Sequence, residues 1–159
     1  ILSLEIQRMP KSIEETFAHP ANYPYLSVCT TSTHDMNPIR AWWEEDREVT
    51  NDFWHMILSN QGEAPYFCEP WICRQILDQH VWSPAMLTIL PLQDWLSMDE
   101  QLRREDPNTE RINVPANSRH YWRYRMHLKL EQLMESKAFN ARVNSLLGRG
   151  GRIQNSIKQ

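Results

Sequence analysis

A histidine and an aspartate stand together at the end of a strand-like segment. Residues 25–30 are mostly apolar or β-branched, and the polar residues Thr33, His34 and Asp35 follow shortly after. The carboxyl ends of strands in (β/α) barrels and open parallel sheets are where functional side chains are presented. A carboxylate placed there could grip sugar hydroxyls during glycosyl transfer. Spacing equally allows Asp35 to cap the helix expected after Pro38, because Asp is a preferred N-cap.

A second polar pair, Gln93 and Asp94, follows the apolar run at residues 85–90. This run is continuous rather than alternating, which is typical of a strand covered on both faces, although a buried helix gives the same pattern. In a parallel sheet the ends of this strand and of the strand at residues 25–30 would be neighbours. We therefore expect the two polar pairs to lie close together.

Other constellations carry weaker signals. The segment 119–125 interleaves three arginines with aromatic residues, but the acidic balance of the chain argues against a nucleic-acid patch and favours packing of Trp122 and pairing of Arg125 with a buried acid. Cys68, Cys73 and His80 match no usual zinc spacing, so no metal site is expected. Neither a glycine-rich phosphate loop nor a Gly-x-Ser-x-Gly elbow occurs.

The elements that would position these residues alternate between strand and helix. Strands are predicted at residues 1–7, 25–30 and 85–90, and helices at 38–57, 69–80 and 128–147, with a long polar loop at 103–118. This order favours an α/β fold with three consecutive βα units around a parallel sheet. Both sheet edges would be open, which predicts that the isolated chain self-associates or has a rearranged fold. We expect residues 148–159 to form a disordered tail.

Composition sets further limits. The net charge of −3 is spread over 17 basic and 20 acidic residues, and no apolar run approaches a membrane span of about 20 residues, so neither nucleic acid nor a membrane is an expected partner. Three cysteines are an odd number, which favours a reducing compartment. Because the chain starts at Ile1 directly in a strand-like segment, we interpret it as part of a longer protein.

Several ordered motifs resemble one known family. They are Thr-His-Asp at residues 33–35, Ile-Arg-Ala-Trp-Trp-Glu-Glu-Asp at 39–46, Pro-Leu-Gln-Asp at 91–94, Arg-Ile-Asn-x-Pro at 111–115 and His-Tyr-Trp-Arg-Tyr-Arg at 120–125. Together they are similar to the C-terminal part of the 4-α-glucanotransferases called amylomaltases or disproportionating enzymes, of the α-amylase clan. The plant cytosolic branch and its bacterial relatives are the most similar.

The resemblance implies a fold and a reaction. The family has a (β/α)8 TIM barrel, so residues 1–147 would supply its C-terminal portion, about strands six to eight with their helices. The implied reaction transfers α-1,4-glucan segments between maltooligosaccharides or glucans by a retaining mechanism, in the cytoplasm and without a metal or organic cofactor. Asp35 would be the transition-state stabiliser. The residues implied to bind substrate are His34, Gln93, Asp94, Asn113 and Trp122.

The same resemblance limits what this chain can do alone. The family's nucleophilic Asp and acid/base Glu belong to strands four and five, which would lie in an N-terminal barrel half that this sequence lacks. Retaining chemistry needs those two carboxyl groups roughly 5 to 5.5 Å apart, and Asp35 replaces neither. We therefore expect the isolated chain to be inactive. The alternatives are a non-catalytic glucan-binding or assembly module that uses Trp and Tyr faces, and an unspecific interaction domain.

Overall fold

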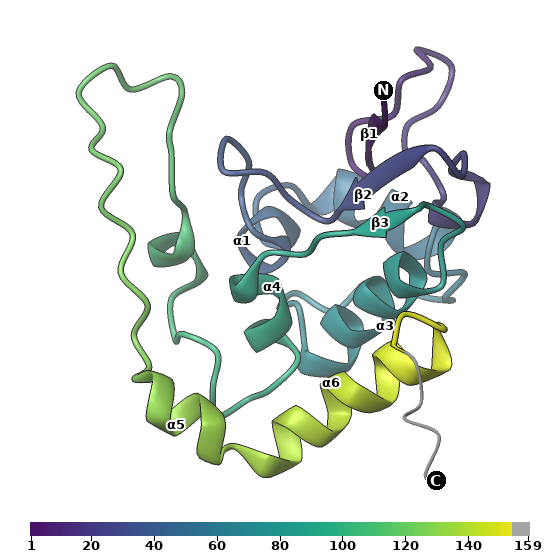
Figure 1. Cartoon of the computed structure of the whole chain (residues 1–159). Coiled ribbons are helices and arrows are strands. Elements are labelled where there is room, and N and C mark those ends of the chain that lie inside the picture. The colour runs from purple at the N-terminus through teal and green to yellow at the C-terminus, as the bar shows by residue number, and fades with distance from the viewer. Residues whose placement is uncertain (154–159) are drawn as a thin grey trace, which may run out of the picture.

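The computed structural model describes residues 1–153 and has an α/β fold (Figure 1). Three short strands, six α-helices and two 3₁₀ turns follow one another along these residues. In chain order they are β1 (Ser3–Ile6), η1 (Pro20–Asn22), β2 (Ser27–Thr30), α1 (Ile39–Trp43), α2 (Arg47–Met56), α3 (Pro70–Val81), β3 (Leu87–Thr88), α4 (Leu92–Ser97), η2 (Pro107–Glu110), α5 (Leu130–Glu135) and α6 (Lys137–Arg149).

The three strands form one parallel sheet in the order β1-β2-β3, which confirms the predicted sheet. Ser3 pairs with Ser27, and Val28 pairs with Leu87. The prediction of three regular βα units was wrong, because only the 3₁₀ turn η1 connects β1 to β2, whereas three helices connect β2 to β3. Pro10, Pro20 and Pro24 interrupt the first connection and exclude a long helix there.

Strand β3 is shorter and less covered than its apolar sequence suggests. It contains two residues, and Leu87 and its neighbours Met86 and Ile89 are exposed. The expectation of a strand covered on both faces is therefore wrong for the residues described. Among these residues β1 and β3 each pair on one side only, so both edges of the sheet are open as predicted.

The helix predicted over residues 38–57 is divided into α1 and α2. The helix is interrupted before Asp46, because the side chain of Asp46 accepts hydrogen bonds from the backbone N–H groups of Glu48 at 2.9 Å and Val49 at 3.2 Å and so starts a new helix. It is the N-cap of α2 rather than part of a solvated helix face. Thr50 secures the junction by donating from its hydroxyl to the carbonyl of Trp43 at 2.7 Å.

The C-terminal region departs from the prediction in two respects. The single helix expected over 128–147 breaks at Ser136 into α5 and α6, and α6 continues to Arg149. Residues 148–153 are not a disordered tail, because Arg152 donates to the carbonyl oxygens of Val81 at 2.9 Å and Ala85 at 2.7 Å. The rest of the predicted tail, residues 154–159, lies outside the described residues.

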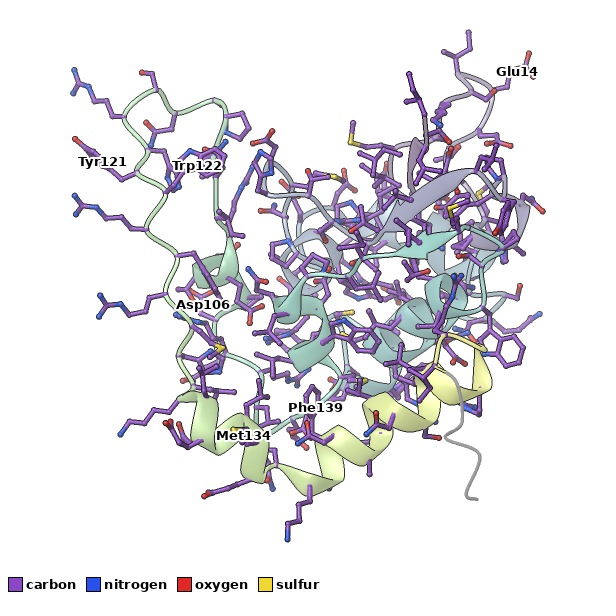
Figure 2. The ribbon with its side chains drawn as sticks, in the orientation of Figure 1. Glu14, Asp106, Tyr121, Trp122, Met134 and Phe139 are labelled. Atoms are coloured by element: carbon purple, nitrogen blue, oxygen red, sulfur yellow. The ribbon has the colours of Figure 1, made fainter. Side chains whose placement is uncertain are left out.

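Most of the buried apolar side chains belong to the helices. The main cluster includes Trp43, Phe53, Ile72 and Leu96, and Phe139 points into it from α6 (Figure 2). The sheet has only a small separate cluster around Cys29. The long loop between α4 and α5 projects from this body as an extended arm (Figure 1). We use "arm" below for residues 111–128.

Candidate functional site

Asp35 and His34 lie beyond the carboxyl end of β2, and both are accessible. Their side chains are 50% and 52% exposed, and His34 Nε2 lies 3.4 Å from Asp35 Oδ2. Asp35 does not cap α1, because the N–H of Ile39 at the start of that helix donates to Asp94 Oδ1 at 2.8 Å. The capping interpretation of Asp35 is therefore wrong, and its carboxylate faces solvent.

Asn113 is the residue that holds Asp35 in place. Its amide Nδ2 donates to Asp35 Oδ1 at 2.6 Å, and its backbone N–H donates to the carbonyl of His34 at 3.1 Å. Two further contacts shape this part of the arm: Arg111 Nε donates to the carbonyl of Asn113 at 2.8 Å, and the ring of His120 lies 2.9 Å from the carbonyl of Ile112. The arm thus meets the tip of β2 through paired backbone and side-chain contacts.

Trp122 brings an aromatic face to the same place. Its ring centroid lies 4.9 Å from that of His34 with the planes tilted by 42°, and 61% of the residue is exposed. Figure 2 shows Trp122 pointing from the arm toward the body of the molecule, whereas Tyr121 points away. An exposed indole face beside a carboxylate and an imidazole can stack on an apolar ring surface while the polar groups accept or donate hydrogen bonds.

Asp94 is inside the protein, which contradicts its predicted contact with substrate. It is 0% exposed, and its Oδ2 accepts hydrogen bonds from the hydroxyls of Thr31 at 2.6 Å and Ser32 at 2.8 Å. With the bond from Ile39 described above, its carboxylate joins the end of β2 to the start of α1. The expected proximity of the pairs at residues 34–35 and 93–94 is confirmed, but the role of Asp94 is structural, because its hydrogen bonds hold β2 and α1 together.

Gln93 is also buried, yet it borders the site. Its Nε2 donates to the carbonyl of Glu110 at 3.3 Å, and it lines a cavity of about 60 Å³ to which His34 also contributes. The structure thus brings Asp35, His34, Asn113 and Trp122 together at one accessible place. Gln93 lies behind them with its amide occupied, so direct contact with a bound molecule is not supported for it.

Arg8 supports the site and was missed by the sequence analysis. One of its guanidinium nitrogens, Nη2, donates to the carbonyl of Thr31, the hydroxyl of Ser32 and the carbonyl of Asn37 at 2.8–2.9 Å. Burial lowers the pKa of Arg8 to about 10, although Asp94 opposes this shift. Its place just after β1, at the carboxyl end of a strand, was the signal that could have found it.

Two other predictions concern metals and membranes. Among residues 1–153 no group of three or more His, Cys, Asp or Glu side chains is arranged to hold a metal ion. Cys68 and Cys73 lie 3.4 Å apart at sulfur, and His80 instead contacts the carbonyl of Ile76 at 2.8 Å, with its pKa lowered to about 4 by burial. Within the described part of the chain, no helix has the length and apolar character needed to cross a membrane.

The amino-acid sequence matches a known family over most of the chain. The model of the 4-α-glucanotransferase family matches residues 1–131. The 4-α-glucanotransferase DPE2 of Oryza sativa subsp. japonica is 37% identical over 152 residues, which are 96% of this chain and 16% of that protein. This chain belongs to the 4-α-glucanotransferase family.

Other members of the 4-α-glucanotransferase family are also similar to this chain over most of its length. The enzyme of Chlamydia pneumoniae is 29% identical over 84% of this chain and 25% of its own length. The structure of an amylomaltase from Streptococcus agalactiae in complex with acarbose superposes with a TM-score of 0.67 over 96% of this chain and 28% of that one, at 19% identity. The fold is thus shared, and the chain spans about a sixth to a quarter of the relatives it matches.

Proposed function

We propose that this chain is the C-terminal part of the catalytic barrel of a 4-α-glucanotransferase, contributing about strands six to eight with their helices. The complete protein would transfer α-1,4-glucan segments between maltooligosaccharides or glucans with retention of configuration, in the cytoplasm. Asp35 is the catalytic residue that this segment contributes. The observation that carries the proposal is the exposed carboxylate of Asp35, oriented by Asn113 at a strand tip.

The chemistry of glucan transfer explains why such a carboxylate is useful. The transition state resembles an oxocarbenium ion, and hydrogen bonds to sugar hydroxyls strengthen as positive charge develops. The Asn113 amide donates to Asp35 Oδ1, and His34 Nε2 lies 3.4 Å from Oδ2, so both neighbours orient a carboxylate that is still half exposed to a sugar hydroxyl. His34 adds a ring nitrogen and Trp122 an apolar face for the glucosyl ring.

The remaining machinery would come from the N-terminal half of the barrel. Bond breaking by retention requires a nucleophile and an acid/base carboxyl group about 5 to 5.5 Å apart, in addition to Asp35. The two other carboxyl groups described at this end of the sheet, those of Asp94 and Glu110, are buried and so are not accessible to a glucan. We therefore expect the isolated chain to be inactive.

The test compares the isolated chain with the complete protein on maltoheptaose. We expect the complete protein to produce a ladder of shorter and longer maltooligosaccharides and the isolated chain to produce none. New chain lengths from the isolated chain would contradict the proposed division of the site.

A second candidate is a non-catalytic glucan-binding or assembly module. The observation that favours it is the exposure of several aromatic side chains, which could stack on sugars: Tyr66, Phe67, Trp71, Trp82, Tyr121 and Trp122. Tight binding of maltoheptaose by the chain, with no turnover even by the complete protein, would favour this module over the enzyme.

A further inference from the structure

Glu110 is a buried acidic residue behind the site. Glu110 is 1% exposed, and neither of its carboxyl oxygens has a hydrogen-bond partner among residues 1–153. Within the same part of the chain, the Nε atoms of Arg40 and Arg104 and the hydroxyl of Tyr124 are also buried without partners. Buried polar atoms of this kind are uncommon in folded proteins and call for an explanation.

Glu110 lies where the arm leaves the body of the protein. It is the last residue of η2, and its carbonyl accepts the hydrogen bond from Gln93 described above. Its side chain lines the cavity of about 60 Å³ that is also bordered by Ser32 and His34. Asn113, three residues later in the chain, donates a hydrogen bond to Asp35. A shift of the Glu110 backbone would therefore be transmitted through residues 111 and 112 to this hydrogen bond.

Arginines from two elements fix the base of this segment. Arg40, on α1, donates from Nη1 to the carbonyl of Arg104 at 2.6 Å and from Nη2 to the carbonyl of Glu105 at 3.3 Å. Arg104 in turn donates to the hydroxyl of Thr109 at 3.4 Å and to the carbonyl of Arg125. All four of these acceptors are neutral groups.

We propose that Glu110 is a positioning residue for the Asp35–Asn113 contact, acting from the polar cluster that it forms with Arg40, Arg104 and Tyr124. Glu110 does not touch substrate in this account. It acts through residues 111–113, which carry Asn113 to Asp35, and Tyr124 belongs to the same extended segment of the arm as Trp122. The inference rests on the proposed function, since Asp35 must be catalytic for its position to matter.

The charge of Glu110 gives this role a measurable signature. Burial raises the pKa of Glu110 to about 7, an effect opposed by the charges of Arg40 and Arg104 and reinforced by that of Asp94. The pKa of Tyr124 is also raised, first by burial and then by Glu110. His34 faces the same cavity. Burial favours the neutral carboxyl group of Glu110, so its ionisation as the pH rises through about 7 is expected to disturb residues 111–113.

The experiment uses the complete protein with Glu110→Gln, which keeps the shape and the neutral state, and Glu110→Ala, which removes the group. For Glu110→Ala we expect kcat for transfer from maltoheptaose to fall about tenfold, with KM within about twofold, because misplacement of a stabilising group affects the transition state most. We expect kcat of the wild type to decline between pH 6 and 8, and we expect Glu110→Gln to keep kcat at pH 6 and to lose this decline. Glu105→Gln, an exposed change nearby, is the matched control.

An independent readout separates this inference from the proposed function. In NMR spectra of the isolated chain, the side-chain amide of Asn113 should shift with a midpoint near pH 7, and this shift should vanish in Glu110→Gln. Absence of the titration from the wild type, or its persistence in Glu110→Gln, would overturn the positioning role. So would a kcat and pH profile of Glu110→Gln and Glu110→Ala identical to wild type. If the complete protein transfers no glucan, the proposed function is wrong. The titration of the Asn113 amide would still test whether Glu110 positions Asn113.

Discussion

Three carboxyl groups near the tip of β2 have three different environments, and these decide their roles. Asp35 is half exposed and held by one amide, Asp94 is buried and accepts three hydrogen bonds, and Glu110 is buried without a partner among the described residues. Only Asp35 is exposed enough to be reached by a sugar. Residue type alone does not distinguish these groups, since all three are carboxylic acids in polar sequence.

Removing the amide that orients Asp35 should impair transfer without unfolding the protein. A hydrogen bond to a charged acceptor contributes about 1.5–3 kcal/mol, so Asn113→Ala in the complete protein is expected to lower kcat/KM for maltoheptaose by roughly 10- to 100-fold. Asn108→Ala removes another side-chain amide between α4 and the arm, which donates a hydrogen bond to Asp106 at 3.1 Å, and should have little effect. Equal activity of the two variants would contradict the role of Asn113.

The stability of the isolated chain should depend on pH through Glu110. Its pKa is raised from the ordinary value of 4.5 to about 7 in the folded state, so its contribution is fully present below pH 4.5 and is lost as pH rises through about 7. Buried His80, with its pKa lowered to about 4, has the opposite trend at lower pH. The comparison of Glu110→Gln with wild type cancels the effect of His80.

Urea unfolding at pH 5 and at pH 8 measures this difference. Glu110→Gln should gain stability relative to wild type as the pH is raised from 5 to 8. A difference between the two proteins that is the same at both pH values would show that Glu110 ionises normally in the folded chain.

Among the elements, α6 is held against the body by its C-terminal end. Gly150 packs so closely on α3 that a Cβ atom would lie 2.9 Å from the carbonyl oxygen of Val81. Arg152 then reaches the carbonyls of Val81 and Ala85. The end of α6, the end of α3 and the approach to β3 thus form one packed junction.

Substitution of the two glycines near this junction should have opposite effects. Gly150→Ala introduces a clash with Val81 backbone and is expected to destabilise the chain by about 1–3 kcal/mol. At Gly148, inside α6, the nearest atom to an added Cβ is 3.9 Å away, so Gly148→Ala should be neutral or stabilising by up to about 1 kcal/mol. Thermal unfolding of both variants tests this; equal melting temperatures would show that the close packing at Gly150 is absent in solution.

Much of this element structure could be predicted from local sequence. The apolar spacing and the Pro70 start signal located α3 within a residue or two, and the apolar runs located β1 and β2. The break between α1 and α2 was missed because the N-cap role of Asp46 competes with an uninterrupted apolar period. The role of Asp94 could not be predicted, because its partners Thr31, Ser32 and Ile39 are more than fifty residues away in sequence.

For the site, too, short sequence motifs predicted some residues, whereas residues that act through long-range contacts were missed. The resemblance of motifs indicated one set of six residues: His34, Asp35, Gln93, Asp94, Asn113 and Trp122. The structure brings His34, Asp35, Asn113 and Trp122 together at an accessible place, whereas Gln93 and Asp94 are buried. Arg8 and Glu110 support this set through contacts that no sequence pattern reveals. Long-range hydrogen bonds and burial, rather than residue type, separate the exposed members of the site from the buried ones.

At the scale of the whole molecule, the three-stranded sheet of the described residues has two open edges. Leu4 on β1 and Leu87 on β3 are exposed on the two edge strands, and Leu26 and Ile89 beside the sheet are exposed as well. Unpaired strand edges with apolar side chains are templates for pairing with other chains. In the complete barrel we expect the N-terminal half to cover these edges.

The isolated chain is therefore expected to self-associate. Light scattering after size exclusion, over a range of concentrations, should show dimers or larger species whose share grows with concentration. Lysine substitutions at Leu4 and Leu87 should reduce this association, whereas lysine at the exposed Met134 of α5, far from the sheet, should not. A monodisperse wild-type monomer at high concentration would contradict the expectation.

The central claim is that Asp35 is one of the catalytic carboxylates of a 4-α-glucanotransferase. The measurement that tests it most directly is the initial rate of maltoheptaose disproportionation by the complete protein and by its Asp35→Ala variant, with far-UV circular dichroism confirming that both are folded. The account predicts that the wild type redistributes glucan chain lengths and that Asp35→Ala abolishes the reaction. Near-normal turnover by the folded Asp35→Ala variant would contradict it.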